Sequence, residues 1–282
     1  KYIPDMRKLT YIIILALFLI ATSCKDKAGT RQRTITVSIE PLRFLTEQIA
    51  GDRFDVAVLV RQGGSPETYE PTAKQLTELA HSDLYIKVGE LGFERTWLKR
   101  IMQNAPHTII VDASEGIKRE LSINGIPDPH VWMSASNAIA MANNIYNKLI
   151  EIDQKDSALF KENLRALTER LRKADTAVRA NITRDKTKAF IIYHPALTYF
   201  ARDYGLTQIP IEEEGREPSA AQLKDVISKG KEENVKILFV QEEFSNRNID
   251  IIKNSLNVEA VAINPLSYHL DEEMIRISKL LQ

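Results

Sequence analysis

Residues 136–182 read SNAIAMANNIYNKLIEIDQKDSALFKENLRALTERLRKADTAVRANI, and this stretch decides the fold because it contains neither glycine nor proline. Its second half carries apolar residues at helical spacing among lysines, arginines and glutamates, at Leu164, Leu167, Leu171 and Ala174. Such a pattern is typical of an amphipathic helix with one buried face. Asp153–Asp156 offers the one plausible break. The stretch therefore predicts either two packed helices of one domain or a long helix that joins two lobes.

On both sides of this stretch, short β-branched runs alternate with helical segments. The runs predict strands at Thr34–Ile39, Val56–Val60, Leu84–Val88, Thr108–Val111, Ala189–Ile192, Ile209–Ile211, Ile237–Val240 and Val258–Ile263. Helices are expected at Pro41–Ala50, Pro71–Ala80, a segment ending near Asn104, Ala196–Tyr204, Ser219–Glu233, Asn246–Leu256 and Asp271–Leu281. Ser219 and Gln222 have the spacing of a capping box. Alternating strands and helices indicate βαβ units with parallel sheets.

The return of this pattern after the helical stretch favours the helix that joins two lobes. We therefore expect an α/β protein of two lobes with parallel sheets, joined by one long rigid helix. The expected limits are an N-terminal lobe at 34–155, a linking helix at 156–183 and a C-terminal lobe at 184–282. The carboxyl ends of the strands are where ligands bind to such sheets, so the loops that follow the strands are the expected binding segments.

The N-terminal residues have the pattern of a secretory signal. Arg7 and Lys8 precede an apolar run from Tyr11 to Ile20, and small residues then lead to Cys24. A run of ten apolar residues is short for a membrane span, whereas the basic start and small-residue end are typical of a signal peptide. The cysteine at this position resembles a bacterial lipobox. We expect a signal peptide at 1–24, a lipid anchor on Cys24 and a polar tether at 25–33; an ordinary signal peptide is the alternative. The mature protein would then be an extracytoplasmic, membrane-anchored lipoprotein, in the periplasm or on the cell surface.

The composition excludes several classes of protein. The 282 residues contain 38 lysines and arginines and 38 aspartates and glutamates, so the formal net charge is zero. A nucleic-acid-binding protein would usually show a basic excess, so none is expected as a partner. The single cysteine rules out an intrachain disulfide and a site of several thiolates. Any metal must therefore be held by nitrogen and oxygen donors. Separately, we expect the protein to be a monomer.

Four loops that follow predicted strands carry residues suited to ligand binding. These loops are Gly64–Pro71, Asp128–Trp132, Tyr193–Ala196 and Ile263–Ser267. Two of the five histidines, His130 and His194, lie in loops that proline makes rigid. Histidine is the commonest metal ligand, and rigid loops hold ligands at a fixed geometry. The pattern makes these two histidines candidate metal ligands.

From Thr34 to its end, the chain resembles the zinc and manganese substrate-binding proteins of bacterial ABC importers. The resemblance is carried, in the family's order and spacing, by the segments PETYEP at Pro66–Pro71, DPHVW at Asp128–Trp132, YHPA at Tyr193–Ala196, EPS at Glu217–Ser219 and NPLS at Asn264–Ser267. It implies two α/β lobes joined by a long helix, with a metal buried between them. It also implies high-affinity capture of a divalent metal and delivery to a membrane permease, not catalysis.

The resemblance implies four metal ligands, one from each of these loops except Glu217–Ser219. His130 matches the family's second ligand, and His194 matches the third, which is histidine in zinc-type members and glutamate in manganese-type members. Glu67 stands where the family normally has its first histidine, and Asn264 stands where many members have an aspartate. The set Glu67, His130, His194 and Asn264 still carries one negative charge. We expect Zn²⁺ as the cargo, with Mn²⁺ or iron as the alternative.

Two other classes of protein remain open at this point. Two histidines and a glutamate can hold a catalytic zinc with an activated water, although the sequence has no H-E-x-x-H motif. A surface adhesin with a purely structural metal is the second rival. The acidic run Glu212, Glu213 and Glu214 is expected to be solvated, and the supply of an oxygen ligand is its alternative role.

Overall fold

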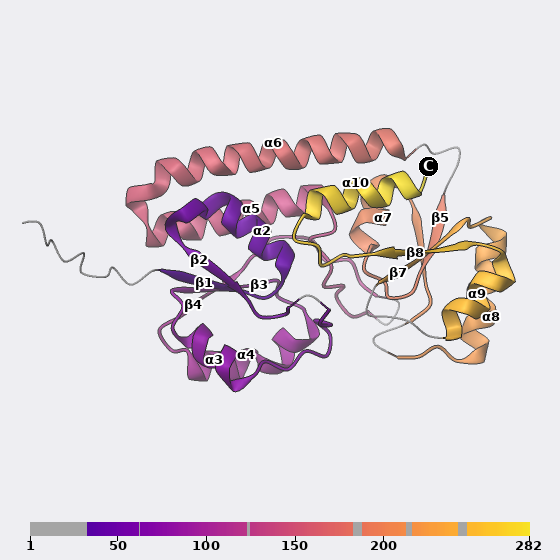
Figure 1. Ribbon diagram of the computed structural model, residues 1–282, viewed down its shortest axis with the longest axis horizontal. Coiled ribbons are helices and arrows are strands. Elements are labelled where there is room, and N and C mark those ends of the chain that lie inside the picture. Colours follow the sequence, from indigo (N-terminus) through magenta and orange to yellow (C-terminus); the bar gives the residue numbers. More distant parts are fainter. Residues whose placement is uncertain (1–32, 62, 123–124, 183–187, 213–215, 242–246) are drawn as a thin grey trace, which may run out of the picture. The chain divides into compact units, whose positions relative to one another are not determined.

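The described residues form two parallel sheets of four strands each (Figure 1). The structure, a computed structural model, describes residues 33–61, 63–122, 125–182, 188–212, 216–241 and 247–282. The predicted signal peptide, Cys24 and nearly all of the predicted tether lie outside the described residues. Within the part of the chain that the structure describes, none of the helices combines the length and hydropathy that crossing a membrane requires.

The first sheet has the strand order β2-β1-β3-β4, with every neighbouring pair parallel. Its strands are β1 (Thr34–Val37), β2 (Asp55–Val58), β3 (Leu84–Lys87) and β4 (Ile109–Asp112). The helices between them are α2 (Glu40–Ala50), α3 (Ala73–Ala80) and α4 (Gly92–Asn104). The predicted helix at Pro71 begins two residues later, because Thr72 and Gln75 form a capping box that fixes its first turn.

The second sheet repeats this topology with the order β6-β5-β7-β8, again all parallel. Its strands are β5 (Ala189–Ile192), β6 (Thr207–Pro210), β7 (Ile237–Gln241) and β8 (Glu259–Ile263). The helices between them are α7 (Thr198–Tyr204), α8 (Ala220–Glu232) and α9 (Arg247–Leu256). All eight predicted strands are therefore confirmed, with ends that shift by one or two residues, and the predicted capping box of Ser219 and Gln222 is present.

The glycine-free stretch contains both of the arrangements that its sequence predicted. It folds into α5 (Ala135–Ile152) and α6 (Ser157–Asn181), separated by a 3₁₀ turn at Gln154–Asp156. The two helices pack against each other, and α6 also packs on α2 of the first lobe and on the C-terminal helix α10 (Leu270–Leu280). The α6 helix is therefore the long helix that links two α/β lobes, as the resemblance implied. The exact limits of the lobes stay a prediction.

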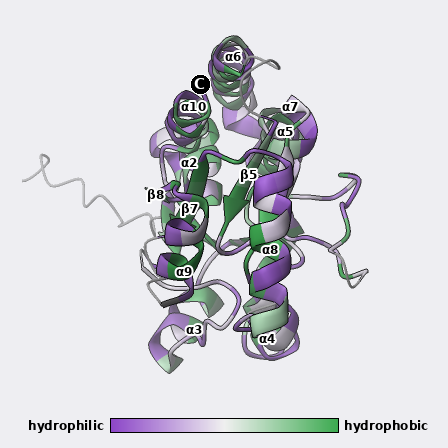
Figure 2. Cartoon of the chain, turned by 90° about the vertical axis from the view of Figure 1, so that its right-hand side faces the viewer, coloured by the Kyte–Doolittle hydropathy of each residue, from purple (hydrophilic) through white to green (hydrophobic). Residues whose placement is uncertain are grey.

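One apolar core extends through both lobes. It includes Ile35 and Phe44 of the first lobe together with Phe190 and Phe239 of the second, and Met274 of α10. A separate, smaller cluster includes Ile191, Val226 and Ile252 of the second lobe. Figure 2 shows hydrophobic strands enclosed by helices that carry hydrophilic residues. Because burial of apolar surface is the main stabilising term in folding, this shared core joins the lobes without help from a ligand.

Hydrogen bonds also join the two lobes beside the core. Trp132 donates its indole N–H to the carbonyl oxygen of Pro265 at 2.8 Å. Tyr199 donates its hydroxyl to the carbonyl oxygen of Asp128 at 2.9 Å. Tyr268 donates to the Glu47 carboxylate at 2.6 Å. Each bond connects a first-lobe residue with a second-lobe residue, so the cleft between the lobes has fixed walls.

Candidate metal centre

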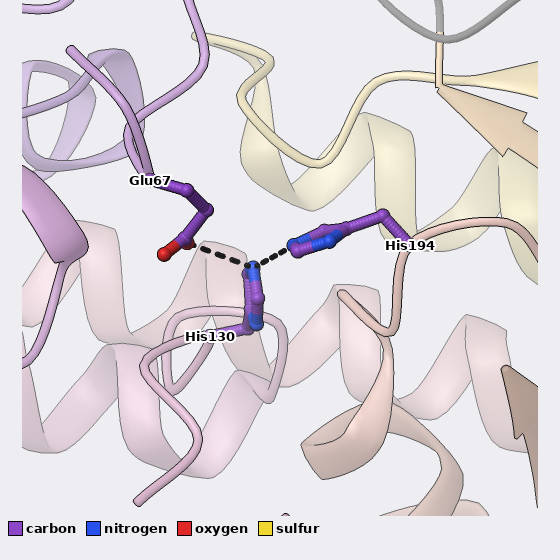
Figure 3. A group of neighbouring side chains, drawn as sticks. All are labelled: Glu67, His130 and His194. Carbon is purple, nitrogen blue, oxygen red and sulfur yellow. Dashed lines mark hydrogen bonds and ion pairs between the residues drawn. The ribbon is translucent and has the colours of Figure 1, made fainter. Parts of the chain in front are cut away.

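Three of the four predicted ligands converge between the lobes. Glu67 lies in the loop after β2, His130 in the loop after β4 and His194 in the loop after β5. Parallel strands end at the same edge of a sheet, which brings these loops toward one another. Each side chain offers one ligand atom, and the three atoms lie within 4.8 Å of one another (Figure 3). This is the kind of cluster that a transition metal needs.

The two imidazoles meet through their Nε2 atoms, which are 3.2 Å apart. The Nδ1 atom of each ring faces a carboxylate, so a neutral ring keeps its proton on Nδ1 and presents the Nε2 lone pair. Two lone pairs at this distance repel each other unless a cation or a proton lies between them. A tetrahedral ion with Zn–N bonds of about 2.0–2.1 Å would hold the two nitrogens about 3.3 Å apart. The observed spacing therefore suits a zinc ion that bridges the two lobes.

Each imidazole is backed by a buried carboxylate. His130 Nδ1 lies 2.9 Å from Asp128 Oδ1, and His194 Nδ1 lies 3.2 Å from Glu212 Oε2. Asp128 also accepts a hydrogen bond from the hydroxyl of Thr198 on the opposite lobe at 2.6 Å. Carboxylates in this position fix the orientation and tautomer of a ligating histidine and make it a better electron donor. The arrangement is that of a carboxylate–histidine pair on each side of the site.

Glu212 corrects one prediction. Its side chain is only 3% exposed and contacts His194, so the expected solvation of this residue is wrong. The backbone N–H of Glu212 donates to the carbonyl oxygen of Tyr193, which holds the end of β6 against the end of β5. The sequence placed Glu212 after a strand, but the pairing of that strand with β5 is a long-range fact. Glu213 and Glu214 lie outside the described residues.

The charges around His130 alter its protonation. Burial by itself lowers the pKa of His130. The negative charges of Asp128, Glu67 and Glu212 raise that pKa by more than burial lowers it, so the net result is a raised pKa. Burial likewise raises the pKa of Asp128, but the contacts with His130 and Thr198 outweigh it and leave that pKa lowered. Asp128 is therefore a carboxylate at neutral pH. When His130 also carries a proton on Nε2, a metal ion that binds there must displace it, because ligation needs the Nε2 lone pair.

Glu67 supplies the negative charge that faces the cavity. Its Oε1 atom is 4.0 Å from His130 Nε2, and within the described structure this buried oxygen has no hydrogen-bond partner. A buried carboxylate oxygen without a hydrogen-bond partner costs free energy, so its position beside the imidazoles suits a bound cation. A tetrahedral zinc would bring this oxygen to about 3.3 Å from the imidazole nitrogen, so only a small movement of Glu67 is needed.

The three side chains line a small cavity together with Ser65, Pro66, Trp132, Gln241 and Leu266. Its volume, measured as the space open to the centre of a water molecule, is about 20 Å³. That is room for about one water-sized particle. The cavity is therefore large enough to hold a single ion.

Gln241 is a site residue that the sequence did not reveal. Its amide nitrogen donates to the carbonyl oxygen of His194 at 2.7 Å, and its amide oxygen accepts from the His194 N–H at 3.3 Å. Gln241 is the last residue of β7 and is 1% exposed. A polar residue at the carboxyl end of an otherwise apolar strand was the available signal. The side chain fixes the backbone of His194 from the adjacent strand.

Asn264, the fourth predicted ligand, is engaged elsewhere. Its amide oxygen accepts a hydrogen bond from the N–H of Leu266 at 3.0 Å, which closes a turn. Its own N–H donates to Glu273 at 2.7 Å. Pro265 and Leu266 line the cavity, whereas Asn264 is absent from the lining residues. The structure thus brings together Glu67, His130 and His194, and ligation by Asn264 stays a prediction.

We expect the buried carboxylates behind the histidines to tune the affinity for metal. Asp128→Asn and Glu212→Gln should each lower the affinity for zinc by about 10- to 100-fold, because the imidazole loses its charged partner. Competition with a chromophoric chelator would measure this. Glu162→Gln is the control, since Glu162 pairs with Arg165 on the exposed face of α6. An affinity unchanged in both site variants would mean that these carboxylates do not support the ligands.

Two imidazoles, each backed by a buried carboxylate, lie between two linked α/β lobes. Beside them is Glu67, whose Oε1 atom has no hydrogen-bond partner among the described residues. These features define a two-lobed metal-binding protein. The model of the ZnuA family, described as zinc-uptake complex component A, periplasmic, matches residues 35–276. The chain therefore belongs to this family, which confirms the resemblance seen in the sequence.

The relatives include both zinc and manganese proteins. The chain is 28% identical over 287 residues to the high-affinity zinc uptake system protein ZnuA of Bacillus subtilis (strain 168), covering 93% of this chain and 89% of the relative. It is 28% identical over 270 residues to the manganese ABC transporter substrate-binding lipoprotein PsaA of Streptococcus anginosus. That match covers 89% of this chain and 86% of PsaA.

A third relative is the zinc-binding lipoprotein AdcA of Streptococcus pneumoniae (strain ATCC BAA-255 / R6). It is 27% identical over 292 residues, and the match spans 95% of this chain but only 57% of AdcA. Among solved structures, a crystal structure of ZnuA superposes with a TM-score of 0.84 at 32% identity, covering 88% of this chain and 97% of that one. The two-lobed fold with its linking helix is therefore the fold of this family.

Proposed function

We propose that this protein captures a divalent transition metal outside the cytoplasm, zinc foremost, and delivers it to the permease of an ABC importer. One observation carries the proposal. The Nε2 atoms of His130 and His194 lie 3.2 Å apart, beside a buried Glu67 oxygen that has no hydrogen-bond partner in the described structure. The names of the relatives, which include zinc and manganese substrate-binding proteins, support the same function.

We propose Glu67, His130 and His194 as the protein ligands. Two imidazoles and one carboxylate suit zinc, which is usually four-coordinate. An octahedral ion would need three donors beyond these three side chains. Manganese is the second candidate, because the Glu67 oxygen suits a harder ion and the PsaA relative is a manganese protein. All three ligands come from one chain, which supports a monomer.

The proposed capture mechanism is local. The ion displaces the proton of His130 and takes the Nε2 lone pairs of both imidazoles, one from each lobe. The Glu67 carboxylate then closes on the ion and neutralises one of its charges. Since the shared core and the bond between Trp132 and Pro265 already hold the lobes, we infer that loading moves the Glu67 side chain more than the lobes. A permease would recognise this loaded form by its differential affinity for the two states.

We expect the protein to remain folded when its metal is removed. The core that joins the lobes is apolar, so the metal-free form should keep its near-ultraviolet circular dichroism and its radius of gyration in small-angle scattering. Zinc should then raise the free energy of unfolding by about 4 kcal/mol at a free concentration 1,000 times the Kd. Unfolding on chelation would instead indicate a structural metal, as in an adhesin. A large compaction on loading would contradict the local mechanism.

We also propose that the protein is not an enzyme. The carboxylates of Asp128 and Glu212 face Nδ1 atoms of the imidazoles, so neither is aimed as a general base at a water on the metal. Glu67 is the carboxylate of the described cluster, and we assign it to the metal. Zinc-dependent hydrolysis of activated ester substrates at a rate above that of free zinc would refute this assignment.

We propose that Cys24 carries a lipid anchor that keeps the protein at a membrane. The lipobox-like sequence supports this, as do the names of the AdcA and PsaA relatives, which are lipoproteins. Bacterial cells that express the full chain with a clickable fatty acid should label the protein. Cys24→Ser should abolish the label and move the protein to the soluble extracytoplasmic fraction, because stable anchoring needs acyl chains. Labelling that survives in Cys24→Ser would place the lipid elsewhere.

A further inference from the structure

Helix α4 touches the backbone of Glu67 at a point where only glycine fits. A Cβ atom on Gly92, the first residue of α4, would lie 2.3 Å from the Glu67 carbonyl oxygen and 2.9 Å from its carbonyl carbon and Cα. Real Cβ atoms essentially never approach other heavy atoms within 3.0 Å. Gly92 does not have a positive φ, so the position needs glycine for space and not for backbone conformation. The helix and the ligand loop are therefore in direct backbone contact.

A hydrogen bond and an aromatic contact fix the loop beside this point. The N–H of Phe93 donates to the carbonyl oxygen of Pro66 at 3.1 Å. This N–H belongs to the first turn of α4, where backbone donors have no partner within the helix. The ring of Phe93 also meets the ring of Tyr69 edge to face, with centroids 5.9 Å apart. The loop is thus attached to α4 immediately before Glu67 and two residues after it.

The first turn of α4 is in turn attached to the sheet. Glu94 is 1% exposed, and its carboxylate accepts hydrogen bonds from the N–H groups of Val88 and Gly89 at 2.8 Å and 2.6 Å. The hydroxyl of Ser38, directly after β1, donates to the same carboxylate. Glu94 therefore ties the start of α4 to the ends of β1 and β3. A rigid path of contacts leads from the sheet through α4 to the backbone of Glu67.

We infer that Gly92 is a positioning residue that sets the distance of the Glu67 carboxylate from the two imidazoles. The inference rests on the proposed function, in which Glu67 is a metal ligand. A side chain at position 92 must push the Glu67 backbone away by roughly 0.7 Å, which exceeds the tolerance of about 0.5 Å within which binding constellations work. Glu94 affects the position of Glu67 indirectly. Its hydrogen bonds fix the first turn of α4, and Gly92 in that turn contacts the Glu67 backbone.

The test is a double-mutant cycle on zinc affinity in the full protein. Gly92→Ala should weaken zinc binding by ~10- to 100-fold, the range for a displaced or unsupported ligand. In a Glu67→Ala background, which retains both imidazoles, the same change should alter the affinity by less than about twofold, because its target is gone. The absorption spectrum of the Co²⁺-loaded protein should also change in Gly92→Ala, since a shifted carboxylate alters the ligand field.

Gly230→Ala is a matched control. A Cβ there would lie 2.7 Å from Leu256 Cδ1 and 3.0 Å from Ile191 Cδ1. These residues belong to the second-lobe cluster and do not line the cavity, so the change crowds a core without touching Glu67. It should lower the unfolding temperature and leave the zinc affinity and the Co²⁺ spectrum unchanged. If Gly92→Ala does not fold, Glu94→Gln is the variant to test. Glutamine keeps the size of the side chain, but its NH₂ group cannot accept the hydrogen bonds that the Glu94 carboxylate accepts from backbone N–H groups. Glu94→Gln should weaken zinc binding only when Glu67 is present.

Two results would overturn the inference while leaving the proposed function intact. One is a wild-type zinc affinity in folded Gly92→Ala. The other is an equal loss of affinity with and without Glu67, which would mean that Gly92 affects the site by another route. Failure of the unaltered protein to bind zinc or manganese would instead refute the proposed function, and the inference with it.

Discussion

Replacing His194 by alanine is expected to lower the affinity for zinc by on the order of 10³-fold. Complete zinc sites of four ligands contribute about 10–16 kcal/mol, so one strong ligand accounts for roughly 3–4 kcal/mol, or 10²- to 10³-fold. The loss falls at the upper end because His194 supplies the second lobe's ligand in the described cluster. Its removal also leaves the buried Glu212 carboxylate without its imidazole partner. Competition titration against a chelator of known affinity measures the change.

The control for this substitution is His107→Ala, which removes an exposed histidine outside the cluster. It should leave the zinc affinity unchanged. His130→Ala should behave like His194→Ala, since the two Nε2 atoms face each other across the same point. If zinc affinity survives in either site variant, the metal is held somewhere other than between these two rings.

Glu67→Ala is expected to abolish tight binding, with a loss of about 10²- to 10³-fold, whereas Asn264→Ala should cost no more than about tenfold. Glu67 is the carboxylate of the described cluster, so its removal takes away both a donor and the negative charge. The amide oxygen of Asn264 already accepts a hydrogen bond from Leu266, so its loss should loosen a wall of the cavity more than the ligand set.

The comparison of these two variants tests where the site's negative charge lies. Equal losses at Glu67 and Asn264 would contradict the assignment of the charge to the first lobe, and so would an unchanged affinity in Glu67→Ala. Glu67→Gln separates the two contributions of the residue, because it keeps an oxygen donor and removes the charge. An intermediate affinity is expected for it.

Local patterns predicted most of the fold. The β-branched runs marked all eight strands, and the Ser219 capping box marked the start of α8. The glycine-free stretch could not be divided with certainty, because Asp153–Asp156 is a weak break that tertiary packing had to settle. Proline is frequent at the first position of a helix, so Pro71 predicts a helix start two residues before the observed one. The capping box of Thr72 sets the start of α3 at Ala73.

The site was predictable only as far as its loops. His130, His194 and Glu67 follow strands in proline-containing segments, and parallel strand ends meet in space. The residues that support them could not be found in the same way. Glu212 and Gln241 reach His194 from two different neighbouring strands, so their roles depend on the strand order β6-β5-β7. Gly92 depends on a contact distance between a helix and a loop, which no sequence pattern states.

Native mass spectrometry of the purified protein, presented with equal concentrations of zinc and manganese, tests the central claim most directly. We predict one zinc ion per chain, retained in competition and lost in His194→Ala. Stoichiometric manganese with zinc excluded would contradict the assignment of zinc as the cargo. The absence of any stoichiometric metal would contradict the claim that Glu67, His130 and His194 form a metal-capturing site.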